Sequence, residues 1–145
     1  MPGSLIDTNC LIDLIQPESA WYAWSAAALA GAVDAGAVAI NPIIYGELGA
    51  GIATIEALEE AFPATIFARL DLPWDAAFLA GQSHRRYRHE GGTRERTLPD
   101  FFIGAHAIVS GLTLVTRDPR RYRRHFPRLK LIAPDTHFGE LMPVG

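Results

Sequence analysis

The chain has 145 residues, of which 49% are hydrophobic and 20% are charged, enough apolar material for one compact core and too little polarity for disorder. We therefore predict a single domain over residues 1–145. The one cysteine, Cys10, excludes an internal disulfide, and the start of the chain lacks the basic segment of a secretory signal. The most apolar stretch, residues 35–46, is too short to cross a bilayer. These features predict a soluble, cytoplasmic protein.

The formal charge of -3 is distributed unevenly along the chain. Residues 1–80 contain ten acidic residues and a single basic one, Arg69, whereas residues 81–145 contain six acidic residues and twelve lysines and arginines. Such a split favours a polyanionic partner for the second half. A solvated basic face explains the same pattern, and the charge alone favours that explanation.

Short β-type runs alternate with helical patterns from the first residues onward. Strands are expected at residues 4–6, 38–40, 66–70, 112–116 and 129–132, and helices at 8–15, 18–32, from 42, 54–62, 74–89 and 97–110, before an irregular tail. This alternation predicts an α/β fold in which helices cover both faces of a mostly parallel sheet.

Four acidic residues stand at the end of a strand or near the start of a helix: Asp7, Glu47, Asp100 and Asp118. Ligands of open α/β sheets bind beyond the carboxyl ends of the strands, so these acids are candidates for one site. Each also has a simpler explanation. Asp100, three residues after Thr97, fits a capping box, and Asp118 before Pro119 fits a helix N-cap, as does Asp7 before the helix from Thr8. Taken singly, Asp100 and Asp118 are better explained as caps.

Glu47 is not explained in this way, because it lies in mid-helix among apolar residues, too far from Asn41 to cap. A buried carboxylate needs a cation or a proton, and a cluster of carboxylates repels itself unless a metal neutralises it. Oxygen ligands without a Cys/His set favour Mg²⁺ or Mn²⁺ over zinc, and none of the five histidines shows ligand spacing. The four acids taken together predict a divalent-metal site for phosphodiester cleavage.

Four motifs in order carry a family resemblance: Leu5-Ile6-Asp7-Thr8-Asn9, Asn41-Pro42-Ile43-Ile44-Tyr45-Gly46-Glu47-Leu48, Leu98-Pro99-Asp100-Phe101-Phe102-Ile103-Gly104-Ala105-His106-Ala107, and Thr116-Arg117-Asp118-Pro119-Arg120-Arg121-Tyr122. Over nearly its whole length the chain resembles the PIN-domain ribonucleases, and specifically VapC-type toxins of bacterial toxin–antitoxin pairs.

The resemblance implies a PIN-like three-layer α/β/α sandwich with about five short strands. It also implies an endoribonuclease that depends on Mg²⁺ (or Mn²⁺), acts as a toxin, forms a homodimer and binds a cognate antitoxin. The metal would be held by Asp7 and Asp100, helped by Glu47 and Asp118, with Thr116 and Asn9 supporting the site.

Two further groups are candidates for macromolecular contact. Arginine binds phosphate in bidentate fashion and stacks on unpaired bases, and arginines flank both Asp100 and Asp118. From these we expect RNA contacts at Arg94, Arg117, Arg85 and Arg86. Trp21 and Trp24 lie on one expected helix, which cannot bury all its aromatic residues on one face, so we hypothesise that they meet an antitoxin segment.

The main alternative is a catalytically silent PIN-like module that binds RNA or protein and whose acids are structural. Two other acidic-pocket classes fit less well. A haloacid-dehalogenase-type phosphatase requires a second aspartate where this chain has Asn9, and a phospho-receiver domain requires a lysine by the pocket, whereas the only lysine, Lys130, lies within the last strand pattern.

Overall fold

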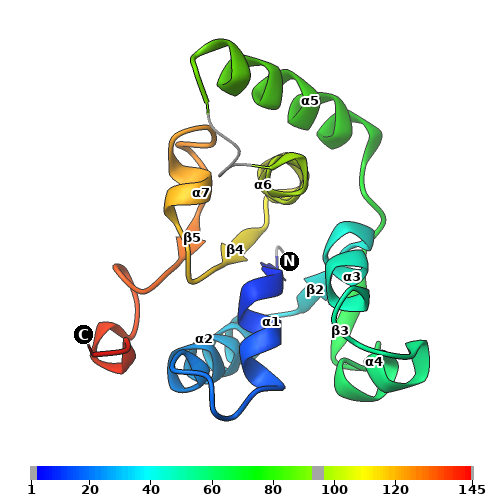
Figure 1. The fold of residues 1–145 in the computed structure, drawn as a ribbon, viewed down its shortest axis with the longest axis vertical. Coiled ribbons are helices and arrows are strands. Elements are labelled where there is room, and N and C mark those ends of the chain that lie inside the picture. The colour runs from blue at the N-terminus through cyan, green and yellow to red at the C-terminus, as the bar shows by residue number, and fades with distance from the viewer. Residues whose placement is uncertain (1–2, 93–96, 145) are drawn as a thin grey trace.

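The computed structural model describes residues 3–92 and 97–144, and its centre is a five-stranded sheet (Figure 1). The strands are β1 (Ser4–Ile6), β2 (Val38–Ile40), β3 (Phe67–Arg69), β4 (Thr113–Val115) and β5 (Leu131–Ile132). Their order is β3-β2-β1-β4-β5, and every neighbouring pair is parallel. The predicted parallel sheet is confirmed.

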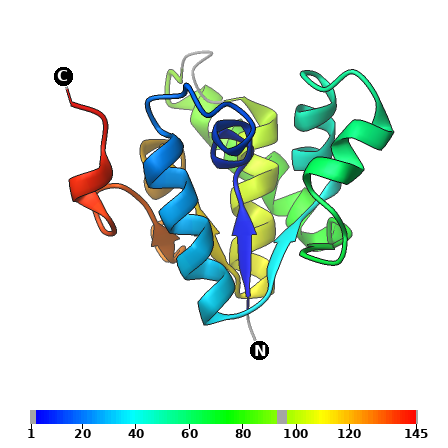
Figure 2. The same ribbon diagram turned by 90° about the horizontal axis from the view of Figure 1, so that it is seen from below.

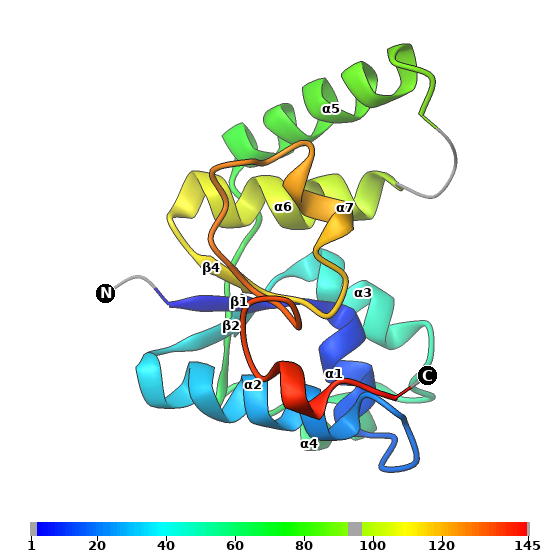
Figure 3. The same ribbon diagram turned by 90° about the vertical axis from the view of Figure 1, so that its left-hand side faces the viewer.

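Helices cover both faces of this sheet. In Figure 3, α6 with α5 outside it lies on one face, and α2 lies on the other, which gives three layers. Figure 2 shows α3 and α4 on one side of the molecule and the C-terminal tail on the opposite side. The helices of the described residues are α1 (Thr8–Leu14), α2 (Tyr22–Ala35), α3 (Pro42–Gly49), α4 (Ile55–Ala61), α5 (Trp74–His89), α6 (Leu98–Ser110) and α7 (Arg120–Arg123), with a 3₁₀ turn, η1, at Gly139–Leu141.

Local signals in the sequence set the helix starts next to the strand ends. Asn41 caps α3, its side-chain oxygen accepting from the Ile44 N–H at 2.9 Å, and Pro42 occupies the first turn. Thr97 and Asp100 form the predicted capping box of α6, which ends at Gly111 with φ of 66°. Asp100 is thus fixed at the start of its helix by backbone geometry.

The core lies between the sheet and its two helical layers. Leu5, Ile40 and Leu114 from the three central strands are fully buried, and Trp24 of α2 is as well. The Trp24 Nε1–H donates to the His137 carbonyl at 2.8 Å, which ties the C-terminal tail to α2. The tail, predicted to be irregular, contains η1. No helix of the described residues has the length and apolarity needed to span a membrane.

The strand order creates one position where chain connections leave in opposite directions. After β1 the chain passes to β2 on one side, and β4 lies on the other side of β1. In parallel sheets the carboxyl ends of such neighbouring strands border a crevice. Asp7 directly follows β1, and Thr116 to Asp118 directly follow β4, so both segments meet at this crevice.

Candidate functional site

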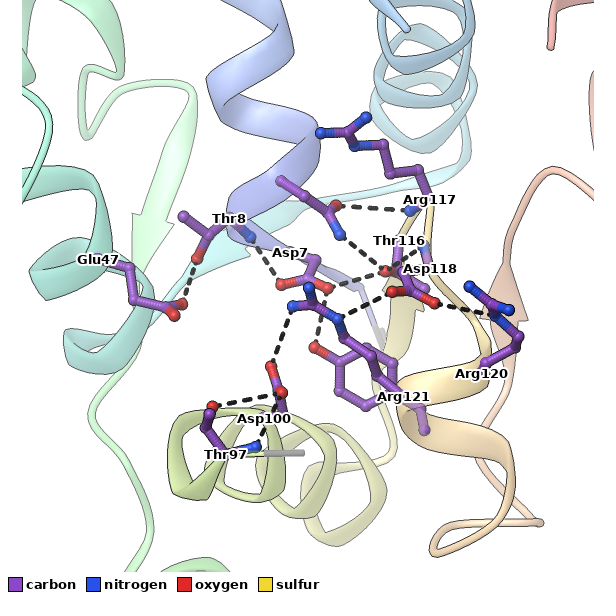
Figure 4. Close-up of polar contacts among 12 residues, drawn as sticks. Asp7, Thr8, Glu47, Thr97, Asp100, Thr116, Arg117, Asp118, Arg120 and Arg121 are labelled. Carbon is purple, nitrogen blue, oxygen red and sulfur yellow. Dashed lines mark hydrogen bonds and ion pairs between the residues drawn. The ribbon is translucent and has the colours of Figure 1, made fainter. Parts of the chain in front are cut away.

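Asp7 is at the centre of the polar network at the end of β1 (Figure 4). Its side chain is 3% exposed, and one oxygen, Oδ1, accepts from the Thr8 N–H at 2.8 Å, so Asp7 does cap α1. The other oxygen, Oδ2, accepts from the Thr116 hydroxyl and the Tyr122 hydroxyl, each at 2.8 Å. The cap and the site therefore use different oxygens of one carboxylate.

The Asp7 carboxyl is buried close to other acids, and its pKa is raised. Burial, reinforced by the charges of Asp100 and Glu47, raises the pKa of the Asp7 carboxyl from 3.8 to about 6, against the opposing effect of the two hydroxyl donors. Burial and the charges of Asp7 and Asp100 raise the pKa of Tyr122 well above 10, so its hydroxyl keeps its proton and donates a hydrogen bond to Asp7. Neutral donors hold Asp7 in place without compensating its charge.

Thr116 connects β4 to this carboxylate. It is completely buried, and besides donating to Asp7 its hydroxyl accepts from the Asp118 N–H at 3.1 Å. Asn9 lies beside it, with its amide nitrogen 3.5 Å from the Thr116 oxygen and its amide oxygen 3.5 Å from the Arg117 N–H. Thr116 and Asn9 thus lie where the sequence predicted supporting residues.

Arg121 lies between two of the predicted acids, Asp100 and Asp118. Its Nη1 is 3.4 Å from Asp100 Oδ1, and its Nε donates to Asp118 Oδ2 at 2.9 Å. Asp118 is not the cap of α7, contrary to the simpler explanation, because the N-cap residue is Pro119 and makes no side-chain cap bond. The Asp118 carboxylate is instead committed to arginines, including Arg120 at 3.8 Å.

Glu47 differs from its expected environment. It lies in the last turn of α3 and is only half-buried, so it does not carry the burial penalty inferred from its apolar neighbours. Its Oε1 accepts from the Thr8 hydroxyl at 2.7 Å, next to Asp7. Glu47 therefore lies at the edge of the group formed by Asp7, Asp100 and Asp118, which we call the acid cluster, and Thr8 connects it to Asp7.

The predicted RNA contacts fall in different places. Arg117 follows Thr116 at the site, and its Nε is 3.3 Å from Asp13, a carboxylate that is 1% exposed. Arg85 and Arg86 are exposed on α5, outside α6, and among the described residues neither contacts the four acids. Arg94 lies outside the described residues. Of the three described arginines of this group, only Arg117 is placed beside the acids.

Trp21 and Trp24 pack edge to face, with ring centres 6.1 Å apart, but have different exposures. Trp24 is fully buried, whereas Trp21 is half-buried and lies under the Arg117 guanidinium at 5.5 Å. Of the two, only Trp21 is available at the surface for a partner.

Sequence reasoning did not single out Tyr122, Arg121 or Asp13 as site residues. Tyr122 and Arg121 lie within the last motif, but only the packing of α7 against α6 turns them toward Asp7 and Asp100. Asp13 lies on α1 between Ile12 and Leu14, and this apolar setting is the one signal in the sequence for its burial.

The donor set fits a hard divalent cation in chemistry. The acids are carboxylates, Asp100 and Glu47 act on Asp7 electrostatically, and a cationic group, the Arg121 guanidinium, already lies between Asp100 and Asp118. In the present arrangement, no three His, Cys, Asp or Glu side chains of the described residues surround a common point closely enough to hold an ion. Arg121 is the cation that now compensates Asp100 and Asp118.

The PIN-domain family model matches residues 4–127, a span that includes all four acids and every strand except β5. The chain belongs to the PIN-domain family. No curated protein matches it.

Solved structures similar to this PIN domain share its fold. One is VapBC2 from Rickettsia felis bound to a promoter DNA fragment, with 21% identity over 90% of this chain and 97% of that one, and a TM-score of 0.68. FitAcB from Neisseria gonorrhoeae has 22% identity, coverages of 93% and 99%, and a TM-score of 0.65. A toxin–antitoxin complex from Klebsiella pneumoniae has 24% identity, coverages of 91% and 98%, and a TM-score of 0.63.

Proposed function

We propose that this PIN domain is a metal-dependent endoribonuclease and the toxin of a toxin–antitoxin pair. The observation that carries the proposal is the meeting of Asp7, Asp100 and Asp118 at the carboxyl ends of β1 and β4, around the cationic Arg121. Family membership supports nuclease chemistry, and the similarity to a toxin–antitoxin complex and to the VapBC and FitAcB structures supports the toxin role.

Mg²⁺ or Mn²⁺ would be held by Asp7 and Asp100, with Glu47 and Asp118 at the margin. Such an ion supplies Lewis-acid chemistry, which activates water and offsets negative charge on a scissile phosphate. The chain's own contribution is orientation. Thr116 and Tyr122 fix one Asp7 oxygen, and Thr97 donates to Asp100 Oδ2 from its N–H at 3.3 Å, leaving Oδ1 directed toward Arg121.

The substrate would approach over the arginines that follow β4. The Arg120 side chain is 86% exposed and lies beside Asp118, so it can receive a phosphate without leaving the protein surface. Single-stranded RNA is the form whose bases and phosphates such a surface can contact together. Arg85 and Arg86 on α5 remain secondary candidates for this contact.

Two protein partners belong to the same proposal. A cognate antitoxin would contact Trp21, the surface member of the tryptophan pair. A second copy of the chain would cover α5, where Trp74 is 92% exposed and Phe78, one turn later, is 71% exposed. Light scattering of the purified protein and of a Trp74→Ser/Phe78→Ser variant tests the homodimer, which the variant should dissociate.

The decisive experiment is cleavage of total RNA by purified, antitoxin-free protein with and without Mg²⁺ or Mn²⁺. Asp100→Asn serves as the test variant, and Asp135→Asn, an exposed acid outside the cluster, as the control. We expect discrete fragments that require metal, persist in Asp135→Asn and disappear in a folded Asp100→Asn variant. Fragments that persist in the Asp100→Asn variant would contradict the proposal.

A silent binding module remains the second candidate, because Arg121 already neutralises part of the acid cluster and Asp7 and Asp100 both serve as helix caps. It predicts RNA or antitoxin binding without cleavage and without metal uptake. Calorimetric titration of the folded protein with Mn²⁺ separates the two functions, because only the nuclease needs the ion.

A further inference from the structure

A cavity of about 510 Å³ opens directly beside the acid cluster. Its walls come from Asn9 of α1, Trp21 before α2, residues 117–121 after β4, and the C-terminal tail with Pro134 and Met142. We call this cavity the Trp21 pocket. Its size falls within the range of small-molecule sites, and its lining combines the Trp21 ring and three apolar residues with six polar or charged side chains. It is therefore suited to a flat, partly polar group.

The wall of the Trp21 pocket is held rigidly from behind by Asp13. That carboxylate is 1% exposed and accepts from the Ser19 hydroxyl at 2.9 Å and the Ser25 hydroxyl at 2.7 Å. It also pairs with Arg117, whose guanidinium lies over the Trp21 ring. A buried carboxylate with three partners fixes Arg117 and Trp21 as a preformed stacking surface, and a preformed surface loses little entropy on binding.

The charges around the pocket favour an anionic ligand over a neutral or basic one. The two carboxylates in the lining are paired, Asp118 with Arg121 and Asp135 with Arg123. Arg120, also in the lining, presents its guanidinium to solvent at the edge nearest Asp118. A phosphate at this edge would leave its attached base free to enter the pocket.

We infer that the Trp21 pocket binds a base of single-stranded RNA, belonging to a nucleotide next to the phosphate held at the acid cluster. The inference rests on the proposed function. Every base has a π-face that stacks on an aromatic ring or a guanidinium plane, so Trp21 and Arg117 supply affinity. The Asn9 amide, which also lines the pocket, offers a donor and an acceptor to a base edge.

The test is binding of a short fluorescein-labelled single-stranded RNA, measured by anisotropy in EDTA so that no metal-dependent cleavage occurs. A stacked base contributes roughly 5- to 150-fold in affinity, so Trp21→Ala should weaken binding within that range. Trp21→Phe should retain most of the affinity because the ring remains. Ile55→Ala is the control, since Ile55 is a large apolar side chain that is 62% exposed on α4 and does not line the pocket.

Equal affinities of the Trp21→Ala and Ile55→Ala variants would overturn the inference, and so would an absence of RNA binding by the wild-type protein. Loss of antitoxin binding by Trp21→Ala with RNA binding unchanged would assign the pocket to the protein partner instead. RNA that binds through Trp21 but is not cleaved after metal is added would contradict the nuclease proposal and would still support the inference about the pocket.

Discussion

Two carboxylates at opposite ends of α1, Asp7 and Asp13, are both buried but are satisfied in different ways. Asp13 is 1% exposed, and two serine hydroxyls and the Arg117 guanidinium surround it. Asp7 is 3% exposed and receives neutral donors only, from Thr8, Thr116 and Tyr122, while other acids lie nearby.

We interpret the difference as one between a structural acid, Asp13, and an acid of the proposed metal site, Asp7. A buried carboxylate paired with a cation and saturated with hydrogen bonds stabilises the arrangement around it. A buried carboxylate with a raised pKa, placed among other acids, is held ready for a positive charge that the protein itself supplies incompletely. We therefore place Asp13 in the scaffold of the Trp21 pocket and Asp7 in the proposed metal site.

The largest expected effect is on RNA cleavage. Asp7→Asn should reduce metal-dependent cleavage at least about 100-fold, because it removes a proposed ligand that also positions the reacting groups. Asp13→Asn, measured below its unfolding temperature, should retain cleavage within about tenfold, since removing a supporting partner costs less than removing a ligand. A gel assay compares the initial cleavage rates of the two variants. Equal losses in the two folded variants would contradict the different roles assigned to Asp7 and Asp13.

The next largest effect is on stability. Asp13→Asn should lower the free energy of unfolding by about 3 kcal/mol, because it leaves the half-buried Arg117 without its counter-charge and disrupts the two serine hydrogen bonds. Urea denaturation measures the change, with Asp34→Asn on the exposed surface of α2 as control. A loss no greater than the control's would show that Asp13 is not a structural anchor.

Asp7→Asn should change stability in the opposite direction above pH 6. The folded pKa of Asp7 is raised to about 6 from 3.8, so the folded state binds more protons and wild-type stability falls as pH rises between these values. The shift corresponds to about 3 kcal/mol, and asparagine caps a helix about as well as aspartate, so the α1 cap is kept. Thermal unfolding should show that the variant is more stable than the wild type at pH 7 but not at pH 4. A constant difference across pH would contradict this.

The position of Tyr122, which donates to Asp7, depends on close packing of its ring against Gly104. A Cβ at this position of α6 would lie 2.5 Å from the Phe126 ring and 3.1 Å from the Tyr122 ring. Gly104→Ala should therefore cost about 1–2 kcal/mol by overpacking and displace the hydroxyl that Asp7 accepts from. Gly46→Ala, where a Cβ would meet nothing within 4 Å, is the control, compared by urea denaturation and cleavage. If both variants behave alike, Tyr122 is not positioned in this way.

The smallest expected effect concerns metal affinity. Arg121→Gln should tighten Mn²⁺ binding by up to about fivefold, because a partly exposed ion pair that competes with the metal is worth up to about 1 kcal/mol. Arg120→Gln removes the same charge from a more exposed side chain beside the same aspartate and should change affinity less. Calorimetry compares the two. An equal gain in both would mean that net charge alone acts, without competition for the site.

Much of the fold was predictable because its signals are local. The helix at residues 74–89 and the starts of α3 and α6 follow from helical periodicity, Asn41-Pro42 and the Thr97 capping box, all within a few neighbouring residues. Local signals failed at Asp118, where the pattern before Pro119 predicts a cap. The structure instead directs the side chain to Arg121, which α7 brings close.

The sequence by itself determined the alternation of strands and helices, the acids that follow β1 and β4, and a family resemblance that the PIN-domain match confirms. Those features depend on periodicity and on short motifs, which neighbouring residues carry. Only the tertiary structure decided which acids are paired with arginines, that Glu47 is half-buried, that Trp24 belongs to the core and Trp21 to a cavity, and that Asp13 supports Arg117. These features depend on contacts between distant residues, such as Asp7 with Thr116, 109 positions away, and Asp13 with Arg117, and folding alone brings such residues together.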